Sequence, residues 1–269
     1  ILELIRKEKP THIAVVFDTA ELTHRHVEFK DYKAHREEMP EDLAASLPYI
    51  DQLLDAFNIA VLKSDGFEAD DVIGTLAQQV KQGGGRCIIS TGDKDLAQLV
   101  NHQVTLINTM SNETLDEKGV LEKFGVPPDR IIDYLTLMGD TVDNVPGVEK
   151  VGPKTAAKWL SEYGSLDALV ARADEIKGVA GENLRKALPW LPTGRQLLTI
   201  KTDCDLLPVV PSLPALDALK ISEPDTLSLR AFYERYGFKG LARALDTGTS
   251  VPQGAAPAAG AQAMPGLFD

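Results

Sequence analysis

Short hydrophobic runs alternate with amphipathic segments along the first part of the chain. The runs are rich in β-branched residues, which favour strands, and they occupy residues 12–17, 61–62, 86–90 and 104–108. Residues 40–57 and 70–80 carry apolar side chains at helical spacing; the first segment begins at a proline, and a glycine run follows the second. Strands that alternate with helices of this length predict an α/β fold with a mostly parallel sheet flanked by helices.

The second part of the chain has a different pattern. From about residue 115 the strand signals stop, and short helical segments follow, several of which end at glycine. We therefore expect an α/β core over residues 1–114 and a small all-helical subdomain over residues 115–245. Residues 246–269 are rich in Ala, Gly and Pro and poor in large apolar side chains. Such a segment cannot repay the entropy cost of ordering, so we expect a flexible linker or tail.

Composition places the chain among globular proteins. It has 269 residues, of which 43% are hydrophobic and 25% charged, enough for one sizeable core or one core plus a small satellite. The sequence contains neither an apolar run long enough for a transmembrane helix nor the apolar stretch of a secretory signal. We therefore expect a cytoplasmic protein with no membrane partner. Cys87 and Cys204 match no zinc spacing, and we expect both thiols to be reduced and structural.

Acidic residues dominate the charge balance and gather at four points. The formal net charge of −12 by itself argues against nucleic-acid binding, but a surplus of carboxylates can also form a divalent-metal site that attracts phosphate. The four groups fall where a strand ends or a helix begins: Asp18; Glu68, Asp70 and Asp71; Asp93 and Asp95; Asp140 and Asp143. Because such points share one edge of a parallel sheet, we expect the groups to converge in one crevice.

Crowded carboxylates predict bound cations. Helix capping or an acidic turn explains any one group alone, but together the carboxylates would repel and raise one another's pKa values. Oxygen ligands without a nearby set of His or Cys residues select Mg²⁺ or Mn²⁺. Two such ions about 3.5 to 4 Å apart would support hydrolysis of a phosphodiester by in-line displacement. The five histidines have no nucleophile motif near them, so no Ser-His-Asp or Cys-His site competes.

Five motifs in one order carry a specific resemblance. They read FDTA, YKAHREEMP, GFEADDVIGTLA, STGDKDLAQLV and LMGDTVDNVPGVEKVGPKTAAKWLSEYGS. Together they resemble the 5′-nuclease domains of bacterial DNA polymerases I, members of the flap endonuclease family, and the similarity spans residues 10–245. The resemblance implies a PIN-like core with a helical arch near residues 19–50, followed by a subdomain with a helix-three-turn-helix element. It also implies a structure-selective 5′-3′ exonuclease or flap endonuclease that depends on Mg²⁺. Such an enzyme would act in DNA replication and repair in the bacterial cytoplasm, in association with the nucleoid.

By this resemblance the eight acidic residues fall on metal-ligand positions. One ion would be served mainly by Asp18, Glu68, Asp70, Asp71 and Asp93, and the other by Asp95, Asp140 and Asp143. Within the acidic loop, Lys94 is expected to act as a counterion. The residues expected to take part most directly in catalysis are Asp70, Asp93 and Asp95, together with Lys33 and Arg36.

The resemblance also places Tyr32, Lys33 and Arg36 on the helical arch, through which a single-stranded 5′ end passes. Lys33 and Arg36 carry the charge needed to hold the scissile phosphate and to offset negative charge in the transition state. Tyr32 offers an aromatic face on which an unpaired base can stack. We therefore expect these three side chains to contact the DNA.

The segment GVEKVGPKTAAKWL predicts two helices joined by a glycine-rich turn, which presents backbone groups and a helix N-terminus to a phosphate. In the family this element grips duplex phosphates without reading bases and can hold a monovalent cation such as K⁺. The candidate DNA-binding residues here are Gly147, Gly152, Lys154 and Thr155. The expected partners are DNA with a 5′ flap, nick or single-strand/duplex junction, an RNA primer, and covalently linked polymerase domains; we expect a monomer.

The first residues depart from the family pattern. Family members open with a strand that ends in Asp-Gly and supplies another metal ligand, followed by a helix with an arginine that contacts DNA. This sequence starts at Ile1, in what resembles the helix before the second strand. We expect a truncated chain with lower stability and weak or absent activity, because loss of a central strand exposes its two neighbours and removes one ligand.

Three alternatives remain open. A phosphatase of the haloacid dehalogenase type has an aspartate after a strand, as in FDTAE, but its second acid would stand where Ala20 is found. A toxin-like PIN ribonuclease shares a carboxylate-lined α/β site, but such chains are much shorter and lack the glycine-rich turn between residues 147 and 154. A catalytically impaired DNA-binding fragment of the same family is the third possibility.

Overall fold

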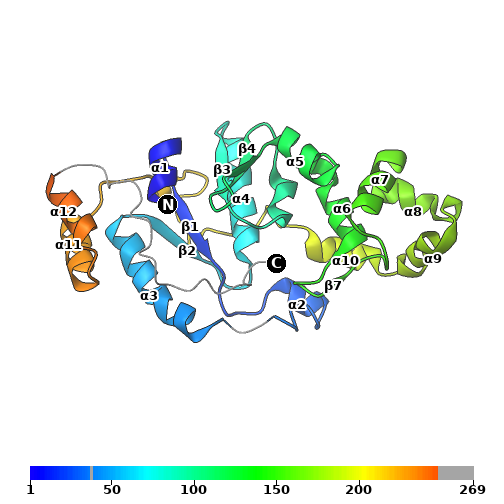
Figure 1. Cartoon of the computed structure of the whole chain (residues 1–269), viewed down its shortest axis with the longest axis horizontal. Helices are drawn as coiled ribbons and strands as arrows, with labels where there is room; N and C mark the ends of the chain where they lie inside the picture. The colour runs from blue at the N-terminus through cyan, green and yellow to red at the C-terminus, as the bar shows by residue number, and fades with distance from the viewer. Residues whose placement is uncertain (37–38, 248–269) are drawn as a thin grey trace. The chain divides into compact units, whose positions relative to one another are not determined.

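A computed structural model describes residues 1–36 and 39–247 (Figure 1). The described residues form two compact units, each with its own internal contacts. Of the described residues, the larger unit contains 1–36, 39–40 and 61–220, and the smaller unit contains 41–60 and 221–247.

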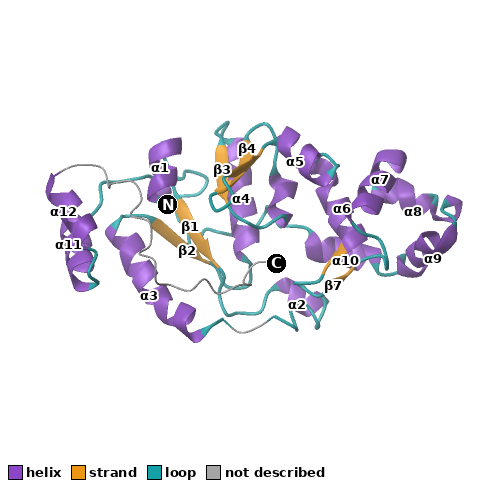
Figure 2. Ribbon diagram, viewed as in Figure 1, coloured by secondary structure: helices purple, strands orange, loops and turns teal. Residues whose placement is uncertain are grey.

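The strands of the larger unit lie where the hydrophobic runs predict them (Figure 2). Strand β1 (Ala14–Phe17) pairs with β2 (Ala60–Lys63). Strand β3 (Cys87–Ser90) runs parallel to β4 (Val104–Asn108), which pairs antiparallel with β5 (Glu113–Leu115). The hydrophobic pattern did not predict β5, because a strand of three residues is too short to show an alternation of apolar and polar side chains.

The strands form separate small sheets rather than one continuous sheet. Within the described residues, β1 and β3 are not paired with each other or through a third strand, so each has one unpaired edge. Helix α4 (Ala69–Gln82) packs against both strands. The predicted α/β class is thus confirmed, while a continuous parallel sheet is absent from the described part of the chain.

Helix α4 is built by local signals at both ends. Glu68 is its N-cap and forms a capping box with Asp71, and Gly83 follows its last residue. One face of the helix is apolar and buried, including Val72. On another face Gly74 allows a close approach, because a Cβ there would lie 2.7 Å from the side chain of Ile200. The start of α4 is therefore held against the chain near residue 200.

The helical part of the larger unit shares its core with the β3–β4–β5 sheet. Its elements are α5 (Glu117–Phe124), α6 (Ile131–Met138), β6 (Gly139–Asp140), β7 (Val145–Pro146), α7 (Pro153–Tyr163), α8 (Leu166–Ala171), α9 (Gly178–Ala187) and α10 (Leu191–Leu198). Helix α6 is almost fully buried and contacts α7, α10 and the 3₁₀ helix Asp95–Leu99. Leu106 of β4 and Leu135 of α6 belong to one hydrophobic cluster. The predicted boundary at residue 114 therefore does not separate two cores.

The smaller unit joins helices from distant parts of the sequence. Helix α3 (Glu41–Ala56) packs against α11 (Thr226–Arg235), which in turn contacts α12 (Lys239–Thr247). Their core contains Ala56, Leu229, Phe232 and Tyr233. We predicted residues 40–57 as part of the α/β core and α11 as part of the helical subdomain, and this assignment is wrong for both helices. The predicted tail lies outside the described residues from residue 248 onward.

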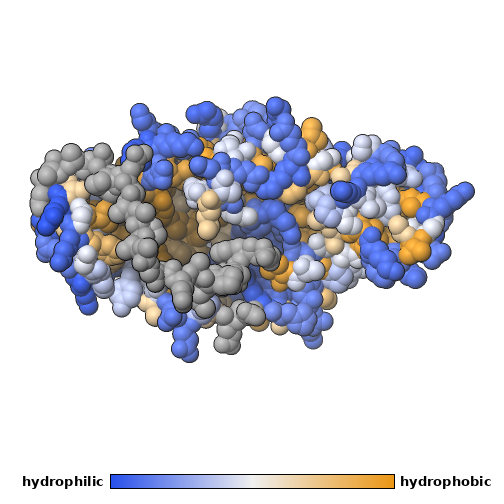
Figure 3. Space-filling model, viewed as in Figure 1, coloured by the Kyte–Doolittle hydropathy of each residue, from blue (hydrophilic) through white to orange (hydrophobic). Residues whose placement is uncertain are grey.

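Two short helices complete the larger unit, α1 (Leu2–Glu8) and α2 (His24–Glu28). Hydrophilic side chains prevail on the visible face in the space-filling view, interrupted by smaller apolar areas (Figure 3). Among the helices of the described residues, none is both long enough and apolar enough to cross a membrane.

Gly147 and Gly152 offer a matched test of packing around the β6–β7 pair. An ideal Cβ on Gly147 would lie 2.1 Å from the carbonyl carbon of Met138, whereas a Cβ on Gly152 would have no atom within 4 Å. We expect Gly147→Ala to lower the free energy of unfolding by about 2–4 kcal/mol, measured by urea denaturation. Gly152→Ala should cost less than about 1 kcal/mol. Equal losses in the two variants would contradict the close backbone packing at Gly147.

Candidate active site

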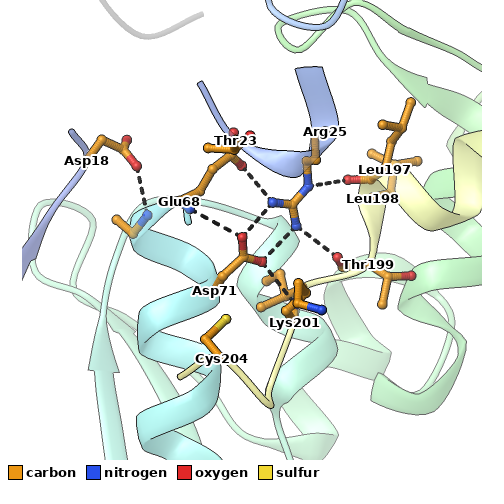
Figure 4. Close-up of polar contacts among 12 residues, drawn as sticks. Asp18, Thr23, Arg25, Glu68, Asp71, Leu197, Leu198, Thr199, Lys201 and Cys204 are labelled. Atoms are coloured by element: carbon orange, nitrogen blue, oxygen red, sulfur yellow. Dashed lines mark hydrogen bonds and ion pairs between the residues drawn. The ribbon is translucent and has the colours of Figure 1, made fainter. Parts of the chain in front are cut away.

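Asp18 lies beside the first turn of α4. It directly follows β1, and its Oδ1 accepts a hydrogen bond of 2.7 Å from the backbone amide of Ala69 (Figure 4). Glu68 caps the same helix, and Asp70 lies in its first turn. A strand end and a helix start thus bring the first two acidic groups together, as the spacing of the motifs predicts.

Asp93 and Asp95 lie in the loop that follows β3. The amide of Asp93 donates to Thr91 Oγ1 over 2.9 Å, and the amide of Asp95 donates to Asp93 Oδ1 over 2.8 Å. These bonds fix the loop as it enters the 3₁₀ helix that begins at Asp95. Within the described part of the chain, Asp95 Oδ1 is buried and accepts no hydrogen bond. A buried carboxylate oxygen without a partner is costly and suits a bound cation.

Asp140 and Asp143 flank the turn between β6 and β7. Asp140 Oδ1 accepts from the amides of Val142 and Asp143, at 2.8 Å and 3.1 Å. Its Oδ2 lies 2.8 Å from Lys94 Nζ, so the fourth acidic group is tied to the loop of the third. The pairing of the two short strands therefore sets the position of both carboxylates.

Electrostatic interactions connect the four groups. Burial, followed in order by the charges of Asp93, Asp18 and Glu68, raises the pKa of Asp70 to about 7. Burial likewise raises the pKa of Asp95 to about 8, with Asp93 and Asp140 as the strongest charged neighbours. Asp70 and Asp95 thus share Asp93 as their strongest charged neighbour and differ in the other acids that act on them: Asp18 and Glu68 for Asp70, and Asp140 and Asp143 for Asp95.

Two lysines neutralise part of this charge. Lys33 Nζ lies 2.8 Å from Glu68 Oε1 and 3.9 Å from Asp143 Oδ2, and Lys94 forms the contact with Asp140. Within residues 1–36 and 39–247, no basic side chain forms a salt bridge with Asp70 or Asp95. Asp70 and Asp95, whose pKa values are raised to about 7 and about 8, therefore form no salt bridge within the described residues, and neither do Asp18 and Asp93.

The acidic side chains lie near one another without closing around a single point. In the part of the chain that the structure describes, no three Asp, Glu, His or Cys side chains are grouped closely enough to hold a metal ion. Backbone amides hold Asp18, Asp93 and Asp140, and the two lysines hold Glu68 and Asp140. Convergence of the four groups is thus seen in their electrostatic coupling and hydrogen bonds.

Asp71 does not belong with the candidate metal ligands. Its side chain is fully buried, and both oxygens accept hydrogen bonds from Arg25, at 2.6 Å and 2.8 Å (Figure 4). The amide of Lys201 donates to the same carboxylate over 2.9 Å. Burial alone would raise the pKa of Asp71, but the hydrogen bonds from Arg25 hold it below its ordinary value. The prediction that Asp71 is a ligand is therefore wrong, since its oxygens are already used.

Tyr32 also differs from its prediction. The side chain is 3% exposed, and its hydroxyl donates to Glu68 Oε2 and Asp143 Oδ2, at 3.1 Å and 3.0 Å. A ring buried in this way cannot stack on an unpaired base. Residues 30–35 form turns, so Tyr32 and Lys33 do not lie on a helix, and Lys33 has a positive φ of 55°. Arg36 is exposed beyond this turn, and its predicted contact with DNA stays a prediction.

The predicted DNA-binding turn lies between β7 and α7. Asn183 donates to the carbonyl of Glu149 over 2.9 Å and so supports the turn from α9. Gly152 is the N-cap of α7, Lys154 is exposed in its first turn, and Thr155 donates its amide to Gly152. The structure gives Gly147 a packing role, and contact of these residues with DNA stays a prediction.

Arg25 is the buried residue at this site that the motifs did not reveal. It is 2% exposed and joins Asp71 to two backbone carbonyls near residue 198. A single arginine in a polar segment carries no periodic signal, and its partners are far away in the sequence. Only a search for basic residues able to balance the buried acids could have singled it out.

Comparison with known families decides the classification. A family model described as "5′-3′ exonuclease, N-terminal resolvase-like domain" matches residues 1–125, and "5′-3′ exonuclease, C-terminal SAM fold" matches residues 126–226. The chain belongs to the 5′-3′ exonuclease family. The predicted family and fold class are thereby confirmed, and the phosphatase and toxin alternatives no longer apply.

Individual relatives agree with this classification. The chain is 38% identical over 246 residues to a 5′-3′ exonuclease of Aquifex aeolicus, covering 91% of this chain and 82% of that protein. It is 43% identical over 248 residues to DNA polymerase I of Pseudomonas aeruginosa, covering 87% and 26%. It is 37% identical over 243 residues to DNA polymerase I of Mycobacterium tuberculosis, covering 89% of this chain and 26% of that protein. The chain thus spans about a quarter of the length of these polymerases.

Solved structures share the fold of this 5′-3′ exonuclease family member. A T5 5′-exonuclease with bound zinc matches with a TM-score of 0.65 at 19% identity, covering 86% of this chain and 87% of that one. A T5 flap endonuclease with DNA and metal ions matches with a TM-score of 0.64 at 19% identity, covering 86% and 88%. The catalytic core of Rad2 with DNA gives 0.53 at 16% identity, covering 82% and 73%.

The raised pKa of Asp95 predicts that the metal-free protein becomes less stable as the pH rises. Its folded pKa of about 8 lies above the unfolded value of about 3.9, so the folded state binds the proton more tightly. The free energy of unfolding should therefore fall as pH rises from about 4 to about 8. In EDTA at pH 8.5, Asp95→Asn should raise stability by about 1–3 kcal/mol, with little effect near pH 4.

Asp71→Asn is the matched control for that measurement. It changes a carboxylate of the same group of acids but leaves Arg25 buried without its anionic partner. We expect Asp71→Asn to lower the free energy of unfolding by about 3–5 kcal/mol at either pH. Thermal and urea denaturation would measure this loss. A destabilising effect of Asp95→Asn in EDTA at pH 8.5 would show that its carboxylate is not under electrostatic strain.

Proposed function

We propose that this chain hydrolyses DNA phosphodiesters near the junction of a single-stranded 5′ flap and a duplex. The observation that carries the proposal is the pair Asp70 and Asp95, two partly buried carboxylates with raised pKa values that form no salt bridge within the described residues. Membership of the 5′-3′ exonuclease family supports a nuclease rather than another use of such a site. Flap recognition, cleavage of RNA primers and linkage to polymerase domains are parts of this proposal.

The donor set fits hard divalent cations. Seven carboxylates remain after Asp71 is removed, and oxygen donors of this kind suit Mg²⁺ or Mn²⁺. We assign one ion to Asp18, Glu68, Asp70 and Asp93, and the other to Asp95, Asp140 and Asp143. When bound, two such ions would polarise the scissile phosphate, activate the attacking water and stabilise the leaving oxygen. Apart from the shared Asp93, the charges that act on Asp70 come from Asp18 and Glu68 and those that act on Asp95 come from Asp140 and Asp143, which supports this partition.

Basic side chains of this chain would handle the phosphate. Lys33 lies among the candidate ligands, and its flexible side chain can turn from Glu68 to a phosphate oxygen. Arg36 is exposed three residues further on and can hold a neighbouring phosphate. In the duplex, backbone phosphates would meet the N-terminus of α7 with Gly152, Lys154 and Thr155, and K⁺ could bind in the preceding turn. We further propose that the chain acts as a monomer.

A second candidate function is DNA binding without cleavage. It is favoured by the absence, within the described residues, of a closed group of three metal-binding side chains, and by the unpaired edges of β1 and β3. Either feature would leave the carboxylates too loosely held for catalysis. Cleavage and binding must therefore be measured separately.

The test is cleavage of a labelled 5′-flap duplex by the 269-residue chain in Mg²⁺, Mn²⁺ or EDTA. We expect weak, metal-dependent cutting near the junction that falls by about two orders of magnitude or more in Asp95→Asn. Glu122→Gln changes an exposed acid on α5 and should leave the rate unchanged. Flap binding without cleavage would select the second candidate, and cleavage in EDTA would contradict the metal-dependent mechanism.

Lys94 allows a test of the metal site that does not depend on cleavage. Its ammonium neutralises Asp140, so Lys94→Met should strengthen Mn²⁺ binding by about two- to fivefold, because the cation no longer competes with an internal charge. Lys123→Met is the control, since Lys123 has the same side-chain exposure of 42% and pairs with Glu113 outside the candidate ligands. Unchanged or weaker Mn²⁺ binding in Lys94→Met, measured by calorimetry, would remove Asp140 from the ligand set.

A further inference from the structure

Arg25 is the most completely bonded charged side chain around the candidate site. Its Nη1 and Nη2 donate to the two oxygens of Asp71, at 2.6 Å and 2.8 Å (Figure 4). Its Nε donates to the carbonyl of Leu197 over 2.8 Å, and Nη2 donates to the carbonyl of Thr199 over 2.9 Å. Every nitrogen of the guanidinium is therefore used, and three separate segments of the chain meet on it.

The surroundings of Arg25 make this buried charge tolerable. Burial of an ion pair costs free energy that is recovered only when the geometry is good and the remaining polar atoms are bonded. The two carbonyls lie at the C-terminal end of α10, where helix carbonyls lack internal partners and the helix dipole favours a cation. Asp71 is also bonded by the amides of Lys201 and Glu68, at 2.9 Å and 3.3 Å.

Arg25 also reaches the candidate metal ligand Glu68. Its Nη1 lies 3.3 Å from Glu68 Oε2, the same oxygen that accepts from the Tyr32 hydroxyl. Arg25 belongs to α2, and the turn that carries Tyr32 and Lys33 follows directly after this helix. One side chain thus holds Glu68, the start of α4 and the helix that leads to Lys33.

The α10 contacts extend this link to the other half of the site. Helix α10 packs against α6 and β7, and α6 leads into β6, where Asp140 lies. Trp190, just before α10, donates from Nε1 to the carbonyl of Pro146 in β7 over 2.6 Å. Arg25 therefore connects the elements that carry Glu68 and Asp70 with those that carry Asp140 and Asp143.

We propose that Arg25 is a positioning residue that aligns the two halves of the metal site. This inference rests on the proposed function and adds a residue that acts through Glu68 and Asp71 rather than on the substrate. Arg25 keeps the Glu68 side and the Asp140 side at one spacing, because its planar fork bonds a carboxylate of α4 and two carbonyls at the end of α10 at once. A lysine keeps the charge but cannot make this set of bonds.

The test compares Arg25→Lys with Arg195→Lys. Arg195 pairs with Asp133 and Asp167, which lie outside the candidate ligand set, so Arg195→Lys makes the same substitution at a structural arginine. We expect Arg25→Lys to weaken Mn²⁺ binding by about tenfold or more and to lower kcat on the flap duplex while KM changes little. The magnetic coupling between two bound Mn²⁺ ions, seen by electron paramagnetic resonance, should also be lost. Arg195→Lys should leave all three unchanged.

A second variant keeps the inference testable if Arg25→Lys does not fold. Arg25→Met combined with Asp71→Leu replaces the buried pair with apolar side chains of similar size, a change that often preserves stability. We expect this variant to fold and still to show weakened Mn²⁺ binding and lost coupling. Wild-type Mn²⁺ binding and coupling in either folded Arg25 variant would overturn the positioning role. Failure of the wild-type chain itself to bind Mn²⁺ would instead overturn the proposed function.

Discussion

Carboxylates from four segments of the chain repel one another in the larger unit, and basic side chains of two kinds, one buried and two partly exposed, offset this repulsion. Arg25 is buried and binds Asp71 through two hydrogen bonds, so it forms a fixed part of the fold. Lys33 and Lys94 are partly exposed and can move away from the acids they neutralise. Asp70 and Asp95 keep raised pKa values, which leaves a site where divalent ions would be favoured.

The fold brings these charges together through contacts between distant segments. Strand ends supply Asp18 and the loop of Asp93, a helix start supplies Glu68, and the short β6–β7 pair supplies Asp140. Helix α6 and the strands share one core, so the helical part is an extension of the α/β part rather than a separate body. The site thus depends on packing across the family's two sequence regions, residues 1–125 and 126–226.

Local patterns in the sequence predicted much of this structure, because strands, helix starts and their flanking acids are local features. The prediction that Asp71 is a metal ligand failed because the sequence does not show the direction of a side chain. Asp70 and Asp71 are adjacent, but one position along a helix turns the side chain by about 100°, and Asp71 points toward Arg25. Tyr32 appeared exposed in a charged segment, but its hydroxyl finds buried acids far away in sequence. The pairing of α3 with α11 likewise depends on long-range packing that periodicity does not encode.

The most direct measurement is the location of Mn²⁺ by anomalous diffraction from crystals of the 269-residue chain. We expect two ions, one beside Asp70 and one beside Asp95, with Lys33 and Lys94 moved away from their carboxylates and Arg25 still bound to Asp71. Mn²⁺ found only at other acids, with both lysines in place, would contradict the proposal that these carboxylates hold two metal ions.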